Sequence, residues 1–84
     1  MKTVEISPLC AQQLGVVHKM GLFAYGKDGM IENEGKFAGM NLRYNDAMVN
    51  FYADVPENAD QCRLIFGDHF SVDSNGDFFL SAIA

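Results

Sequence analysis

The residue types that most often carry chemistry are scattered through this sequence. Cysteine and histidine occur at Cys10, His18, Cys62 and His69, and no two of them stand at the short spacings of a zinc site. Nucleophilic catalysis by Cys10 would need a base on the same helix face, but His18 is displaced by about 80° at 3.6 residues per turn. The sequence therefore predicts no metal ion, no cofactor and no catalytic set, and it predicts buried thiols at both cysteines.

One acidic run is similar to a cation site. The segment Asp73-Ser74-Asn75-Gly76-Asp77 follows the first half of a calcium-binding loop, but its glycine comes too early and no glutamate follows at the twelfth position. A hairpin turn with Gly76 in the left-handed conformation explains the run better. Glu32 and Glu34 would lie on one side of a strand, which fits acid or base chemistry but fits a solvated sheet edge better.

The elements that position these residues begin with a strand over residues 3–6. Ser7 then has the character of an N-cap and Pro8 that of a first helical residue, so a helix is predicted through residues 8–20, with Gly21 as its stop. Its buried stripe follows the helical period and comprises Cys10, Leu14 and Val17, widened by Leu9, Val16 and Met20.

Two hairpins are predicted next. The first covers residues 22–34, with Gly29 in its turn and Tyr25 opposite Ile31. The second has a two-residue turn at Asn45-Asp46, which pairs Leu42 with Val49, Met40 with Phe51 and Ala38 with Ala53 on the buried face. The opposite face is then polar and carries Asn41, Arg43, Asn50 and Tyr52.

A second helix and a last hairpin complete the chain. The helix is predicted from Pro56 or Ala59 to Phe66, ending at Gly67, with Ala59, Cys62, Ile65 and Phe66 on its buried face. The hairpin turns at residues 74–76 and pairs Val72 with Phe78 and Phe70 with Leu80. Phe79 and Ile83 then fall on the opposite face, where either a helix or a partner must cover them.

These elements predict an α+β fold. The order is strand, helix, four strands in two hairpins, helix and two strands, forming an antiparallel sheet with both helices packed on one face. The 84 residues, 49% of them hydrophobic, are expected to form a single compact domain, 1–84. The start lacks a signal-peptide apolar region and no run approaches the roughly 20 apolar residues that span a membrane, so we expect a cytoplasmic protein.

Charge is distributed unevenly. Residues 44–84 hold seven carboxylates and one basic side chain, a net charge of −6, whereas residues 1–43 carry +1. Nucleic acids and anionic membranes both need cationic neutralisation, so this acidic half argues against direct binding of either. A protein partner with a basic surface would be attracted to it. Solubility and helix capping explain the same carboxylates without any partner.

A short, acidic α+β chain without a catalytic set resembles, in type, the small inhibitors with which phages and mobile elements block host or defence enzymes, anti-CRISPR proteins among them. The resemblance implies a protein that occupies the basic nucleic-acid-binding surface of a target. The residues expected to contact that surface are six carboxylates and two aromatic anchors: Asp54, Glu57, Asp60, Asp68, Asp73, Asp77, Tyr52 and Phe79.

Two other functions stay open. A structural or regulatory subunit could form a homodimer through an exposed hairpin edge and the face that carries Phe79 and Ile83. A small enzyme could use paired carboxylates or His69 in a dimer cleft. The sequence favours the inhibitor or modulator over the homodimer, and the homodimer over the enzyme.

Overall fold

The structure, a computed structural model, describes residues 1–16, 29–30, 35–45 and 47–84. Its elements, in chain order, are β1 (Lys2–Ile6), α1 (Pro8–Gln13), β2 (Gly29–Met30), the 3-10 turn η1 (Gly35–Phe37), β3 (Arg43–Asn45), β4 (Asn50–Val55), α2 (Ala59–Phe66), the 3-10 turn η2 (Gly67–His69), β5 (Phe70–Val72) and β6 (Phe78–Leu80). Helices and antiparallel sheets confirm the α+β class. The predicted order is matched roughly, with three described strands between the helices where four were expected.

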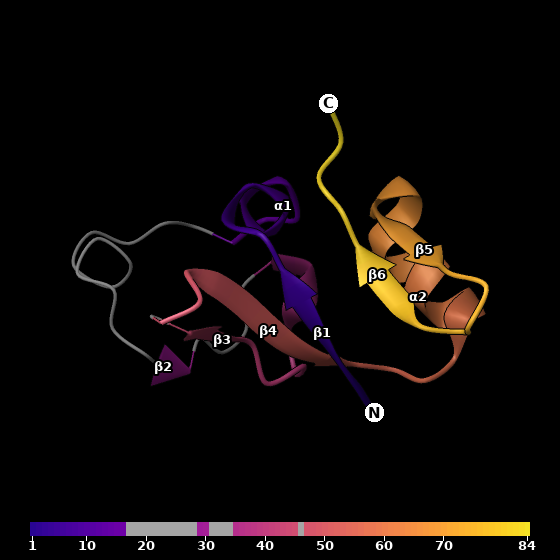
Figure 1. Cartoon of the computed structure of the whole chain (residues 1–84), viewed down its shortest axis with the longest axis horizontal. Helices are drawn as coiled ribbons and strands as arrows, with labels where there is room; N and C mark the ends of the chain where they lie inside the picture. Colours follow the sequence, from indigo (N-terminus) through magenta and orange to yellow (C-terminus); the bar gives the residue numbers. More distant parts are fainter. Residues whose placement is uncertain (17–28, 31–34, 46) are drawn as a thin grey trace.

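The strands form two antiparallel sheets. The larger has the order β1-β4-β3-β2, and the smaller is the hairpin β5-β6. Helix α1 contacts β4 of the larger sheet and α2 contacts β5 of the hairpin (Figure 1). The single sheet expected from the sequence is therefore divided in two, and each part has its own helix.

One apolar core joins the two parts. Alternation on β1 buries Val4 and Ile6, and alternation on β4 buries Phe51, Ala53 and Val55. The rings of Phe37 from η1 and Phe66 from α2 meet at 5.3 Å between centroids, so side chains of both parts pack on one another. Full burial of one such ring stabilises the fold by roughly 1.5–3 kcal/mol.

Helix α1 begins as predicted but ends early. The Ser7 hydroxyl accepts a hydrogen bond from the Cys10 amide at 3.1 Å, and Pro8 occupies the first turn. The prediction that the helix continues to residue 20 was wrong, because its last residue is Gln13 and Gly15 takes a φ of +95° that turns the chain away. Residues 17–20 of the predicted helix lie outside the described residues.

The predicted register of the second hairpin was also wrong. The pairs are Arg43 with Tyr52, Tyr44 with Phe51 and Asn45 with Asn50. Residues 46–49 therefore connect the strands, in place of a two-residue turn. The Asn45 side chain accepts a hydrogen bond from the Met48 amide at 3.0 Å, which stabilises this longer connection.

This shift changes which residues are buried only near the ends of the hairpin. Phe51 pairs with Tyr44 in place of Met40, so the register differs from the predicted one by an even number of residues. An even shift keeps each side chain on the same face, and Met40, Leu42, Phe51 and Ala53 are buried as predicted. Val49 is instead exposed at the connection, and Ala38 is exposed in the turn after η1.

The first predicted hairpin lies mostly outside the described residues, Tyr25 and Ile31 included. Gly29, expected in its turn, belongs instead to β2 and pairs with Tyr44 of β3. The prediction of a turn at Gly29 was therefore wrong.

The second helix and the last hairpin agree with prediction. The Asn58 side chain caps α2 by accepting from the Gln61 amide at 3.0 Å, and Gly67 ends the helix with a φ of +60°. Gly76 has a φ of +82°, and the strand pairs are Phe70 with Leu80 and Val72 with Phe78. No helix in the described part of the chain is long and apolar enough to cross a membrane.

Candidate functional site

Strands β1 and β6 lie side by side and run in the same direction (Figure 1). No main-chain hydrogen bond joins them in the described part of the chain, so each presents an edge to the other. A groove of about 570 Å³ lies along this junction, and we call it the β1–β6 groove. It is lined by Lys2, Thr3, Val4, Glu5, Asp77, Phe78 and Phe79.

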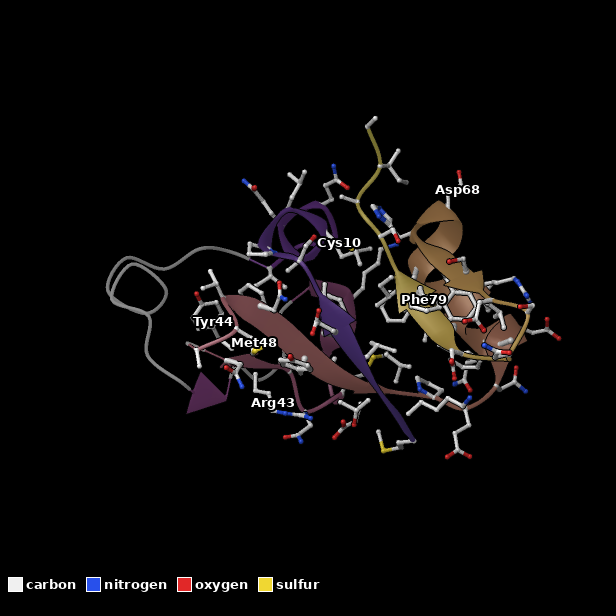
Figure 2. All side chains as sticks on the ribbon, in the orientation of Figure 1. Cys10, Arg43, Tyr44, Met48, Asp68 and Phe79 are labelled. Carbon is white, nitrogen blue, oxygen red and sulfur yellow. The ribbon has the colours of Figure 1, made fainter. Side chains whose placement is uncertain are left out.

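Strand alternation explains which side chains reach the surface here. Val4 is buried, so its neighbours Thr3 and Glu5 face outward from β1. On β6, Leu80 is buried and Phe79 points away from the core with 47% of its surface exposed, as predicted. Figure 2 shows Phe79 in front of β6. The groove therefore has a buried apolar floor and an exposed aromatic ring on one wall.

The groove already holds a cation from the chain itself. The Lys2 ammonium donates a hydrogen bond to the Gly76 carbonyl at 3.1 Å and lies 4.5 Å from the centroid of the Phe78 ring. A cation over an aromatic face is attracted by the electron density of the ring. Lys2 therefore occupies the Phe78 ring face and the Gly76 carbonyl, and its positive charge lies in the groove with the carboxylates of Glu5 and Asp77.

Asp77 is the free carboxylate of this wall. Its side chain has no hydrogen-bond or ion-pair partner among the described residues. It stands across the turn from Asp73, since the Asp73 amide donates to the Asp77 carbonyl at 3.0 Å.

Asp73 is used mainly within the turn. One of its carboxylate oxygens accepts hydrogen bonds from the amides of Asn75 at 2.9 Å and Asp77 at 2.8 Å. These bonds hold the three-residue loop closed, which explains the calcium-loop-like run as a hairpin turn. Asp73 contributes its charge near the groove but does not line it.

Tyr52 is linked to the groove through Glu5. Its hydroxyl donates to the Glu5 carboxylate at 2.9 Å, across the β1–β4 ladder. This hydrogen bond holds the phenol proton and raises the pKa of Tyr52, and partial burial and the negative charge of Glu5 act in the same direction. Tyr52 therefore orients the Glu5 carboxylate at the groove.

Asp54 is committed to the fold. Its carboxylate accepts from the Thr3 hydroxyl at 2.7 Å and the Asn41 side-chain amide at 3.0 Å, and Arg43 lies 3.3 Å away. The hydrogen bonds from Asn41 and Thr3 lower the pKa of Asp54, and the positive charge of Arg43 lowers it further. The structure thus gives Asp54 three partners on the outer face of the larger sheet.

The remaining predicted carboxylates, Glu57, Asp60 and Asp68, do not line the groove. Glu57 pairs with the N-terminal ammonium at 2.8 Å, and that hydrogen bond and charge lower its pKa. Asp60 pairs with Arg63 of the same helix at 3.1 Å. Asp68, on η2, projects from the end of the C-terminal half, away from Phe79 (Figure 2). Of the eight predicted residues, Asp77 and Phe79 line the groove. Tyr52, Asp54 and Asp73 each bond a residue that lines it, namely Glu5, Thr3 and Asp77, and the charge of Lys2 helps to lower the pKa of Glu57.

Five of the seven residues that line the groove were not among the predicted site residues: Lys2, Thr3, Val4, Glu5 and Phe78. Alternation in the first strand signals that Thr3 and Glu5 face away from the core. Their proximity to Asp77 has no local signal, because β1 and β6 are far apart in sequence and share no ladder.

A second hollow, of about 400 Å³, lies between α1 and the β3–β4 connection. None of the described residues around it is charged, and its walls include Leu9, Val16, Tyr44 and Val49. Leu9 and Val49 are themselves largely exposed. This hollow offers apolar contact but no group that would select a ligand by charge.

Of the residues with catalytic potential, Cys10, Cys62 and His69 are described by the structure, whereas His18, Glu32 and Glu34 lie outside the described residues. Cys10 and Cys62 are buried free thiols, as predicted, and burial raises the pKa of both. The Cys62 thiol donates to the Pro56 carbonyl at 3.2 Å. The His69 ring nitrogen Nδ1 donates to the Ser81 carbonyl at 2.9 Å. Among the described residues, no three His, Cys, Asp or Glu side chains are grouped so that they could hold a metal ion.

Comparison of the chain with known protein families, with curated proteins and with solved structures found no match.

Proposed function

We propose that this protein binds a protein partner with a basic surface and acts as an inhibitor or modulator of that partner. The contact is made by the β1–β6 groove. The observation that carries the proposal is that Asp77 and the exposed ring of Phe79 line the same groove. Asp77 has no side-chain partner in the described part of the chain, and in the same groove Lys2 lies over the ring of Phe78.

The chemistry of the groove suits an arginine or lysine side chain of the partner. The aliphatic part of such a side chain would pack on Phe79, while its charge would meet Asp77 and Glu5. The net charge of −6 over residues 44–84 would accelerate association and make it sensitive to salt. An exposed aromatic ring within a charged surface is also a typical anchor of protein interfaces.

A nucleic-acid-binding protein is one class of partner that has a basic surface. In that case this protein, bound to its partner, would block the nucleic-acid site of the partner, as an inhibitor of the anti-CRISPR type would. Such an inhibitor would act in the cytoplasm. The proposal needs no nucleic acid or membrane contact from this chain.

Salt-dependent capture from a lysate tests the proposal when three forms are compared. The tagged wild type should retain a basic protein at low salt and release it at high salt. The variant Asp77→Asn with Phe79→Ala should lose that protein. Asp68→Asn should keep it, because it removes the same charge from a site outside the groove. Equal retention by all three forms, or no retained protein, would contradict the groove as the binding site.

The homodimer remains the alternative, and the exposure of Phe79 (47%) and Ile83 (45%) favours it. Light scattering over a dilution series distinguishes the two. A dimer that resists dilution, dissociates in Phe79→Ser and persists in Asp77→Asn would support self-association in place of a basic partner.

A further inference from the structure

The last residues of the chain, which we call the tail (residues 81–84), leave β6 and pass α1 (Figure 1). The Gln13 side chain makes two hydrogen bonds to the main chain of Ile83. Its Nε2 donates to the Ile83 carbonyl at 2.8 Å, and its Oε1 accepts from the Ile83 amide at 2.8 Å. A glutamine amide thus takes the place that a peptide group of a neighbouring strand would have.

His69 holds the tail at a second point. The Ser81 amide donates to the His69 carbonyl at 2.9 Å, and the His69 ring donates to the Ser81 carbonyl at 2.9 Å. Both main-chain groups of Ser81 and both of Ile83 are therefore satisfied, each pair by one residue from elsewhere in the fold.

The side chains of the tail add little to this attachment. All four tail residues are exposed, and Ile83 keeps 45% of its surface in contact with solvent. Ordering an exposed segment has an entropic cost, and main-chain hydrogen bonds at a wet surface offset only part of it. Segments of this kind open locally at a much lower free energy than the core.

The tail continues the strand that forms one wall of the β1–β6 groove. That wall is tied to the β1–α1 segment at both ends. Lys2 binds Gly76 just before β6, and Gln13 binds Ile83 just after it. Because no ladder joins β1 to β6 within the described residues, these two ties help set the distance between the groove walls.

We propose that the tail is a releasable strap, in which Gln13 is the positioning residue that keeps β6 in the place that forms the groove. With the strap tied, the groove is preformed. With the strap released, β6 keeps its ladder with β5 and the Ser81–His69 bonds but loses its tie to α1. Among the hydrogen bonds of the described residues, only the one from Lys2 to Gly76 then joins the two groove walls, so their spacing is less tightly fixed. The effect on partner binding rests on the proposed function, whereas the strap itself is testable in the isolated protein.

Hydrogen exchange of single amides tests the strap. In Gln13→Ala the Ile83 amide loses its acceptor, and its exchange should become about tenfold faster, the effect of losing one or two such bonds. The amide of Ala53 in the buried strand β4 should be unaffected. Gln12→Ala is the matched control, because Gln12 is the exposed neighbour whose side chain makes no hydrogen bond in the described part of the chain. Equal Ile83 exchange in both variants would overturn the strap.

Titration with a hexa-arginine peptide at low salt tests the link to the groove. In the wild type, the NMR signals of Asp77 and Phe79 should shift. Gln13→Ala should weaken this response several-fold without a change in global stability, and Gln12→Ala should not. If the wild type does not respond, the proposed function fails while the exchange result still decides the strap. If Gln13→Ala binds as tightly as the wild type, the role of the strap in the groove is overturned.

Discussion

At the scale of single residues, three aspartates have three different roles in the structure. Asp54 is saturated by donors from Thr3, Asn41 and Arg43, and Asp73 closes a turn through two amides. Asp77 has no side-chain partner among the described residues and lies in the groove. Substitution should therefore affect stability at Asp54 and binding at Asp77.

Replacing Asp54 should give a pH-dependent loss of stability. Its pKa is lower in the folded chain than in the unfolded chain, so the ionised form stabilises the fold above about pH 4, and this contribution disappears as the pH falls through the folded pKa. We expect Asp54→Asn to lower the free energy of unfolding by about 1–2 kcal/mol at pH 7, because donors lose a charged acceptor. Urea denaturation of the wild type and of Asp54→Asn measures the free energy of unfolding at pH 7 and at pH 2.5.

The difference between wild type and Asp54→Asn should shrink at the lower pH. Asp68→Asn serves as the control and should match the wild type at both pH values, since Asp68 has no partner in the described part of the chain. A difference that is equally large at pH 7 and pH 2.5 would show that the charge of Asp54 is not what stabilises the fold.

Val49 carries local backbone strain. It is a β-branched residue with a φ of +53°, a conformation that costs an L-residue about 1–2 kcal/mol. Val49→Gly should remove this cost, and after the larger entropy of the unfolded chain is counted it should stabilise the fold by about 0.5–1 kcal/mol. Thermal denaturation measures the change. Val49→Ala keeps the strain and should show no such gain; an equal gain in both variants would refute the role of φ.

At the scale of elements, the end of α1 depends on two glycines that meet from distant segments. Gly15 and Gly35 both have positive φ, and their backbones are in close contact. The Lys36 amide donates to the Leu14 carbonyl at 3.1 Å at this crossing. The absence of side chains on both glycines lets η1 approach the end of α1, where Gly15 turns the chain away.

Two glycine-to-alanine substitutions separate close approach from conformation. A Cβ at Gly35 would overlap the Leu14 carbonyl oxygen and lie 2.7 Å from the Gly15 carbonyl carbon, whereas a Cβ at Gly39 would meet open space. Gly35→Ala should cost about 3 kcal/mol or more, from overlap and positive φ together, and Gly39→Ala about 1 kcal/mol from φ alone. Urea denaturation compares them, and equal losses would contradict the tight crossing.

At the scale of the whole molecule, one core spans two sheets. Cys10 is buried in the part with the larger sheet and Cys62 in the part with the hairpin, so the two thiols report on opening of each part. If residues 1–84 unfold as one domain, as the sequence predicts, both thiols should become reactive together.

Thiol labelling in increasing urea tests this cooperativity. Burial raises the pKa of both cysteines and so reduces their thiolate, and reaction with a disulfide reagent should require opening. Peptide mapping by mass spectrometry should show Cys10 and Cys62 modified to the same extent at each urea concentration. Modification of Cys62 well before Cys10 would show that the hairpin part opens independently.

Features that depend on residues close in sequence were predictable from the sequence. Ser7 and Pro8 start α1, Asn58 caps α2, and residues 74–76 turn the last hairpin. Each of these rests on a side chain that bonds a main-chain group a few positions away, or on a glycine at a fixed place in a turn. Neither needs information from the rest of the chain.

Features that depend on contacts between distant segments were decided by the tertiary structure. Gly35, from a distant segment, packs against Gly15 at the end of α1, although the helical period of the sequence continues beyond it. An even shift of the β3–β4 register keeps the same faces buried, so alternation alone does not select the register. The acidity of the C-terminal half, in contrast, follows from the sequence alone. Which carboxylates stay free, Asp77 and not Asp54, was decided by which donors the fold brings within hydrogen-bond distance.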